Sequence, residues 1–273
     1  MANVDAVELI AHRMVWSLVF LVVLMVWLHT GRQAIEAYRN WRSVGLNFLS
    51  GVLLTINWVI YIWGVNAGHV IECSLGYFLV PLLNVGLGRL VLKESLRPLQ
   101  WLAVGAATMG VAVLVVKVGH VPWIALGLAF SFGFYGLLRK KSPLGSLVGL
   151  TVETSLVAPF AAAWLLWLAC DGRGSLGHVD LHTTAFVLST GVVTAIPLLL
   201  FGYGALRLRL TTLGLLQYAA PTLQFLLGWL VYHEPFSKDR AEAFLLIWMG
   251  LAIYSLDAWT QQRRDRSAVA APA

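Results

Sequence analysis

The chain contains nine mostly apolar stretches, each about as long as a lipid bilayer is thick. Because an α-helix rises about 1.5 Å per residue, roughly 20 apolar residues are enough to cross the hydrocarbon core. Only short links join the stretches, so the sequence predicts an all-α polytopic membrane protein without a soluble domain. The predicted helices cover residues 8–28, 44–65, 70–92, 99–116, 121–138, 146–168, 183–204, 211–232 and 241–259.

The composition excludes the alternative classes. Charged residues make up only 12% of the 273 residues, about half the share found in an average soluble domain. So few charges cannot cover a soluble globule, and so apolar a chain is not intrinsically disordered. Cys73 and Cys170 fall in or beside apolar stretches, so a disulfide-stapled secreted fold is excluded as well.

The positions of the basic residues predict the orientation in the membrane. If successive helices alternate across the bilayer, 14 of the 19 Lys and Arg residues fall on one side, among them Arg139, Lys140 and Lys141. Basic loops stay in the cytoplasm, so we expect a cytoplasmic C-terminus and an outer N-terminus. The net charge of +6 is then a topology signal, and no nucleic-acid partner is expected.

The two halves of the chain resemble each other at one constant offset in residue number, without gaps. An odd number of predicted helices separates the copies, so the repeat is inverted, which is the architecture of secondary transporters. We predict a first repeat over 1–118, a second over 119–260, and a disordered cytoplasmic tail over 261–273. The matching pairs include Pro81 with Pro221, Asn84 with Gln224, Gly88 with Gly228, Glu94 with Glu234, and Gly110 with Gly250.

Polar residues recur on one face of several predicted helices. Such stripes normally turn away from lipid, and a mid-helix proline allows a bend. We interpret the stripes as a cavity for a small organic solute, with helix–helix packing as the alternative. The predicted hinges are Pro81, Pro197 and Pro221. The predicted pathway residues are Asn57, Trp58, Tyr61, Ser74, Tyr77, Asn84, Gln217, Tyr218 and Gln224.

A few ionisable residues lie within or at the ends of the apolar stretches. Glu153 is about two turns inside its helix, so it needs a partner, a proton or a polar cavity. His69 and Glu72 are three residues apart on one helical face and could exchange a proton. We interpret these three residues as candidates for proton or charge coupling, whereas Glu94 and Glu234 are expected to cap or brace helix ends.

The sequence lacks the motifs of metal sites, nucleophilic hydrolases and phosphate-binding loops, so no cofactor, metal or enzymatic activity is expected. Two other functions stay open as alternatives to transport. The first is an intramembrane transferase that uses His69 and Glu72 as acid and base. The second is a non-transporting membrane scaffold derived from a permease.

Several runs of residues are similar to one known family, the RarD group of EamA-type permeases in the drug/metabolite transporter superfamily. The resemblance covers roughly residues 5–260. It is carried by Leu9–Arg13, Asn57–Trp63, Gly68–Val70 with Glu72, Ser74–Tyr77, Pro81–Asn84, Leu138–Lys141, Gln217 with Tyr218, Ala220–Phe225 and Glu234–Ser237.

The resemblance implies a bacterial inner-membrane permease of ten helices, built as an inverted five-plus-five repeat. The family pattern has a full helix before Leu9–Arg13, whereas only eight residues precede this run here, so the first helix is expected to be missing. We therefore expect a secondary transporter that moves a small organic solute by alternating access. Proton coupling and a homodimer are left open, and the chloramphenicol label of some members is a weak guide to the solute.

Overall fold

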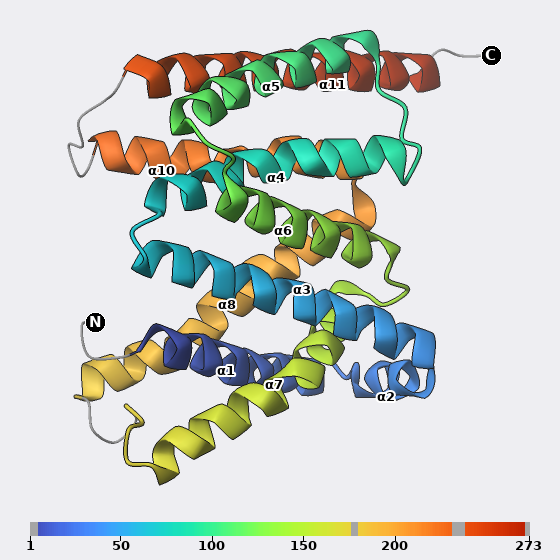
Figure 1. Cartoon of the computed structure of the whole chain (residues 1–273). Helices are drawn as coiled ribbons and strands as arrows, with labels where there is room; N and C mark the ends of the chain where they lie inside the picture. Colours follow the sequence, from blue (N-terminus) through green and yellow to red (C-terminus); the bar gives the residue numbers. More distant parts are fainter. Residues whose placement is uncertain (1–4, 176–179, 231–237, 271–273) are drawn as a thin grey trace. The chain divides into compact units, whose positions relative to one another are not determined.

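The computed structural model describes residues 5–175, 180–230 and 238–270, which form the helices labelled in Figure 1. Seven of these helices (α1, α3, α4, α5, α7, α8 and α11) are long and apolar enough to span a membrane, which confirms the predicted fold class. The bounds are α1 Ala6–Trp27, α2 Gly31–Arg39, α3 Trp41–Asn66, α4 Val70–Leu90, α5 Pro98–Val118, α6 Trp123–Lys141, α7 Ser146–Cys170, α8 Leu181–Arg207, α9 Leu210–Gln217, α10 Ala219–Leu230 and α11 Lys238–Ala270.

Each predicted apolar stretch is helical over most of its length in the part of the chain that the structure describes. Helix α2 is an additional short helix within the predicted link between the first two stretches. Helix α11 continues to Ala270, over most of the segment for which a disordered tail was predicted. Helix α6 is 19 residues long and ends in three basic residues, which explains why it is less apolar than the seven spanning candidates.

The predicted helix 211–232 is interrupted at Tyr218, where α9 ends and α10 begins. The interruption follows from Pro221, which has no N–H to donate to the carbonyl of Gln217 four residues earlier. Prolines also lie inside α4 and α8, at Pro81 and Pro197, but these two helices are continuous. Of the three predicted hinge residues, Pro221 lies beside a helix interruption, whereas Pro81 and Pro197 lie within continuous helices.

The repeat detected in the sequence is also visible in the positions of the helices. Three pairs of helices begin at the offset that separates Pro81 from Pro221, so the two halves share the same pattern of elements. Counting back by this offset from α6 leads to a position before the first residue of the sequence. The paired first residues are Ala6 with Ser146, Trp41 with Leu181, and Val70 with Leu210.

Two compact units are formed, and each takes helices from both halves of the sequence. Unit 1 comprises Met1–Ala67 and Phe134–Leu208, and its helices are α1, α2, α3, α7 and α8. Unit 2 comprises Gly68–Gly133 and Arg209–Ala273, and its helices are α4, α5, α9, α10 and α11. Helix α6 contributes its first part to unit 2 and its second part to unit 1.

In unit 1, α1 packs against both α7 and α8. The contact with α8 is close at Gly191, where a side chain would collide with the backbone of Trp16. The Ser17 hydroxyl donates a hydrogen bond of 3.0 Å to the carbonyl of Gly191 at the same crossing. Small residues let membrane helices approach closely, and hydroxyl groups add polar bonds between them.

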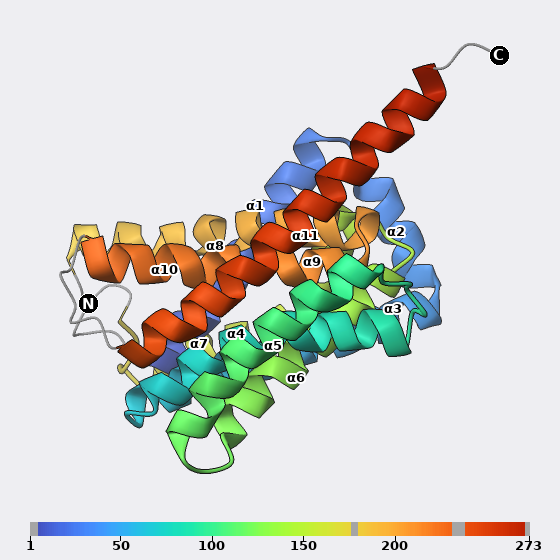
Figure 2. The same ribbon diagram turned by 90° about the horizontal axis from the view of Figure 1, so that it is seen from above.

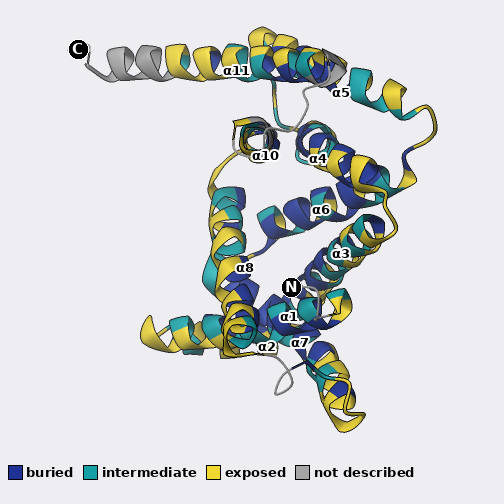
Figure 3. Ribbon diagram, turned by 90° about the vertical axis from the view of Figure 1, so that its left-hand side faces the viewer, coloured by how far each residue is buried: buried dark blue, intermediate teal, exposed yellow. Residues whose placement is uncertain are grey.

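In unit 2, α5 and α11 lie side by side (Figures 1 and 2). Gly110 and Gly250, which are equivalent in the repeat, bring the two backbones together. A Cβ atom at Gly110 would lie 2.7 Å from the carbonyl oxygen of Ala243, and one at Gly250 would lie 2.6 Å from that of Ala103. In Figure 3, the buried parts of these helices alternate with exposed parts, as expected for helices that pack on one side only.

We predict that Gly250→Ala destabilises the α5–α11 pair by about 1–3 kcal/mol, because the added methyl group overpacks a backbone contact. Thermal unfolding of the detergent-solubilised protein measures the effect. The matched control is Gly105→Ala on α5, where a Cβ atom meets nothing within 4 Å and is expected to be neutral or slightly stabilising. Equal unfolding temperatures for the two variants would contradict the prediction.

Candidate transport site

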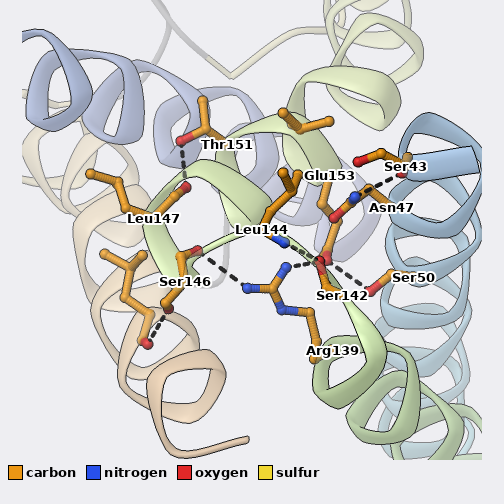
Figure 4. A network of polar contacts seen from close by, with 12 residues as sticks. Ser43, Asn47, Ser50, Arg139, Ser142, Leu144, Ser146, Leu147, Thr151 and Glu153 are labelled. Atoms are coloured by element: carbon orange, nitrogen blue, oxygen red, sulfur yellow. Dashed lines mark hydrogen bonds and ion pairs between the residues drawn. The ribbon is translucent and has the colours of Figure 1, made fainter. Parts of the chain in front are cut away.

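The polar centre of unit 1 is an ion pair between Arg139 of α6 and Glu153 of α7 (Figure 4). Both side chains are 1% exposed, and the distance from Nη1 of Arg139 to Oε2 of Glu153 is 3.8 Å. The Ser50 hydroxyl of α3 donates a hydrogen bond of 2.8 Å to the same carboxylate oxygen. The fully buried Tyr135 also interacts with this carboxylate. Glu153 thus has the partner that a buried charge requires.

The basic run predicts that Arg139 lies at the cytoplasmic surface with Lys140 and Lys141, whereas the structure places its side chain inside unit 1. Two glycines make room for the guanidinium. A Cβ atom at Gly149 would lie 2.5 Å from Nη1, and one at Gly202 would lie 3.0 Å from Nη2. Nη2 donates to the carbonyl of Ser146 over 3.2 Å. In the sequence, Glu153 alone within its apolar stretch indicated that a cation from another helix should lie beside it.

A polar face of α3 turns toward this ion pair. Ser43, Asn47, Ser50 and Asn57 are all buried, and their spacings of four, three and seven residues place them on one side of the helix. The amide of Asn47 donates to the carbonyl of Ser43 over 2.8 Å. Of these residues only Asn57 was among the predicted pathway residues. Ser43 lies outside the predicted apolar stretch, which explains why it is not among the predicted pathway residues. Asn47 lies inside that stretch and is also not among them.

A small cavity lies beside Glu153 between α1, α3, α7 and α8. Its volume is about 20 Å³, enough for one water molecule and too small for an organic solute. Trp58, another predicted pathway residue, lines the cavity together with the polar residues Ser17, Thr55 and Thr154. Of the predicted residues in unit 1, Trp58 and Glu153 therefore border a space of water size.

Arg13 lies at the position of the repeat that corresponds to Glu153, because the two are separated by the offset of the repeat. Its guanidinium carbon is 4.8 Å from the centre of the Trp58 ring, and Nε donates to the hydroxyl of Thr194 over 3.0 Å. Equivalent positions of the two halves thus carry opposite charges, and each is bonded to a hydroxyl group of another helix in unit 1.

A second buried pair in unit 1 consists of Glu8 and His12, four residues apart on α1. The distance between His12 Nε2 and Glu8 Oε1 is 3.5 Å, and both side chains are almost fully buried. Glu8 also accepts hydrogen bonds of 2.7 Å from the amide and the hydroxyl of Ser175. The pair ties the link after α7 to the start of α1. Its spacing was a signal in the sequence that the prediction did not use.

In unit 2, the two predicted stripes meet where α4 crosses α9. The amide of Asn84 donates a hydrogen bond to the side-chain oxygen of Gln217. The backbones are close at the same level, because a Cβ atom at Gly214 would lie 2.7 Å from the carbonyl oxygen of Pro81. Tyr218 is fully buried, and its hydroxyl donates to the carbonyl of Phe78, its repeat equivalent, over 3.2 Å.

The remaining predicted pathway residues are more exposed. Ser74 and Tyr77 lie on the first half of α4, Gln224 lies on α10, and all three side chains are exposed. Tyr61 on α3 is 36% exposed. The predicted stripe of α4 therefore has an exposed part near Val70 and a buried part at the crossing with α9.

Glu72 of α4 lies between two histidines at one end of unit 2. Its Oε1 is 3.8 Å from Nδ1 of His69 and 3.9 Å from Nε2 of His120. The amide of Ile124, at the start of α6, donates to its other oxygen over 3.4 Å. His69 and Glu72 are thus close to each other, as the prediction requires. His120 is a second histidine near the same carboxylate. Within 5–175, 180–230 and 238–270 no group of three or more His, Cys, Asp or Glu side chains is arranged to hold a metal ion.

Two further polar contacts join helices at the other end of unit 2. Glu94 accepts hydrogen bonds from the amides of Leu210 and Thr211, at 2.7 and 3.0 Å, and so caps the start of α9 as predicted. Arg97 donates to Asp257 over 2.9 Å and joins α5 to α11. Glu234, the repeat equivalent of Glu94, lies outside the described residues.

These features define the class of protein: a multi-pass helical membrane protein with an internal repeat and polar groups buried between its helices. The family model of the EamA-like transporter family matches residues 1–116. An uncharacterized transporter of Pseudomonas aeruginosa is 46% identical over 96% of this chain and 88% of that protein. Protein RarD of Streptomyces exfoliatus is 44% identical over 98% of this chain and 85% of that protein.

The chain therefore belongs to the RarD group of EamA-type transporters. Protein RarD of Escherichia coli is another relative, 42% identical over 96% of this chain and 88% of that protein. A solved crystal structure of a protein is similar with a TM-score of 0.70, over 93% of this chain and 88% of that chain. At 23% sequence identity, this likeness shows the fold alone.

We predict that Arg139→Gln and Glu153→Gln each destabilise unit 1 by about 3–5 kcal/mol, because each leaves a buried group without its partner. The double variant is expected to be less destabilised than the sum of the single variants. Unfolding in detergent measures the stability of the unaltered protein, the two single variants and the double variant. Lys141→Gln, which changes an exposed residue of the same helical turn, is the control. Strictly additive losses would show that the two side chains do not interact.

Proposed function

We propose that this protein is a secondary transporter that moves a small organic solute across the bacterial inner membrane by alternating access. The observation that carries the proposal is the set of three helix pairs that begin at one constant offset in the sequence. Two similar halves of opposite topology can exchange conformations and so open a site to either side of the membrane. Membership of a transporter family supports the same conclusion.

The chemistry of the two stripes supports an uncharged or weakly polar solute. Asn57, Asn84, Gln217 and Gln224 offer amide groups, and the predicted pathway adds tyrosines and Trp58. Aromatic faces with a few hydrogen-bonding groups suit an organic molecule better than a bare ion. Chloramphenicol, a neutral aromatic amide that appears in the name of one relative, is a practical first probe.

Glu153 is the candidate for proton coupling that the contacts favour most. Its carboxylate and the guanidinium of Arg139 balance each other in a site that is 1% exposed. Protonation of Glu153 would leave the arginine without its counter-charge, which is costly within a membrane protein. Proton uptake would thereby favour a rearrangement of α6, α7 and α3. His69 and Glu72 form the alternative coupling site.

We predict that Asn84→Ala and Gln224→Ala each reduce solute uptake by about tenfold, equivalent to about 1.4 kcal/mol. A thermal-shift screen of metabolites and antibiotics that includes chloramphenicol selects the solute, and uptake is then measured in proteoliposomes at matched protein content. Thr108→Ala, which removes an exposed hydroxyl of α5, is the control. Unchanged uptake in both amide variants would remove these residues from the pathway.

We predict that Glu153→Gln abolishes the stimulation of uptake by an imposed proton gradient, because a glutamine cannot exchange a proton. Uptake of the selected solute is compared with and without the gradient in proteoliposomes. Glu36→Gln, on the exposed face of α2, is the control and should behave as the unaltered protein. Loss of stimulation in Glu72→Gln alone would instead assign coupling to the site with His69.

A further inference from the structure

The helices α4 and α9 hold one end of unit 2 closed. Pro81 and Asn84 of α4 are buried against Gly214 and Gln217 of α9, and the two amide side chains are hydrogen-bonded. Asn84 is 0% exposed. The contact therefore joins α4 and α9 tightly at the level where the two polar stripes meet.

The loop after α4 reinforces the closed end. Glu94 holds the first amides of α9, and Arg209 donates to the carbonyl of Ser95 over 3.2 Å. The fit is close, because a Cβ atom at Gly88 would lie 2.8 Å from Oε2 of Glu94. These contacts fix the start of α9 to the end of α4, so the amide pair is part of a larger closure.

The opposite end of the same two stripes is exposed. Ser74 and Tyr77 of α4 and Gln224 of α10 all have exposed side chains, and Tyr77 is 37% exposed. The interruption at Tyr218 separates α10, which carries Gln224, from α9, which carries the closed contact. The stripe is thus buried near Asn84 and exposed near Tyr77.

The repeat relates these two ends to each other. Its constant offset makes Gln224 the equivalent of Asn84, and Tyr77 the equivalent of Gln217. The repeat therefore maps the contact between Asn84 and Gln217 onto a pair formed by Gln224 and Tyr77. When two inverted repeats exchange conformations, a contact made by one set of positions is replaced by the contact of the equivalent set.

We propose that the Asn84–Gln217 hydrogen bond is one gate of the transporter, and that a contact between Tyr77 and Gln224 forms the opposite gate in the other state. The two contacts alternate, so that the stripe is open to only one side at a time. With the predicted orientation, the gate at Asn84 faces the cytoplasm and the described state is open to the outside. The inference rests on the proposed alternating access, but its test requires no knowledge of the solute.

The test is site-directed cross-linking in inverted membrane vesicles and intact cells. Cysteines replace Asn84 and Gln217 in one variant, and Tyr77 and Gln224 in another, after Cys73 and Cys170 have been changed to alanine. Because these side chains are longer than cysteine, a short cleavable bifunctional thiol reagent is used instead of direct oxidation. Both variants are expected to cross-link, each in the conformation in which its gate is closed.

Control pairs shift one member of each gate to a neighbouring position. Leu83 contacts α6 at Gly133 and therefore faces away from α9, so Leu83→Cys with Gln217→Cys should cross-link poorly. The equivalent control for the other gate is Leu223→Cys with Tyr77→Cys. The controls separate a specific contact from general proximity of the helices.

A separate reporter measures access to the stripe. Ser74→Cys, on the exposed part of α4, is labelled from outside by a membrane-impermeant maleimide that can later be distinguished from the cross-linker. Labelling is expected to persist when Asn84 and Gln217 positions are linked and to fall at least about fivefold when Tyr77 and Gln224 positions are linked. Cleaving the linker should restore it.

Failure of the Tyr77–Gln224 pair to cross-link above its control, or labelling that is unchanged by that link, would overturn the gate assignment. Labelling of Ser74→Cys only from the cytoplasmic side would overturn the assigned sidedness. If the two links switch access as expected while no solute is transported by the unaltered protein, the gates stand and the proposed transport function fails.

Discussion

The ion pair between Arg139 and Glu153 is the interaction on which unit 1 depends, because a charge buried among membrane helices has no water to stabilise it. Its requirements explain the residues around it. Gly149 and Gly202 leave space for the guanidinium, and Ser50 donates a hydrogen bond to the carboxylate. Helices α3, α6 and α7 are thus positioned by one pair of charges.

Unit 2 is organised by close backbone contacts and by neutral polar groups. Gly110, Gly214 and Gly250 each lie where a side chain would collide with a carbonyl group of a neighbouring helix. The hydrogen bond between Asn84 and Gln217 lies at one of these crossings. Such neutral contacts are weaker than a buried ion pair, so they are suited to a contact that forms and breaks during transport.

Pairs of residues in contact were harder to predict than the helices that carry them. The stripe on α4 predicted Asn84, and the stripe on the second half predicted Gln217, but their mutual hydrogen bond joins residues 133 positions apart. Glu153 was predicted to need a partner, yet Arg139 was counted among the loop charges because it precedes Lys140 and Lys141. Whether a basic residue at a helix end points to water or inward depends on the rotation of the helix.

The sequence by itself determined the membrane class, the apolar helices, the repeat offset and the family, since apolar length and residue spacing are properties of a single stretch of chain. Tertiary structure alone decided which polar groups meet: Ser50 with Glu153, Arg139 with the same carboxylate, and Glu94 with the start of α9. These pairings depend on how helices from distant parts of the chain rotate and pack, and no local pattern encodes that geometry.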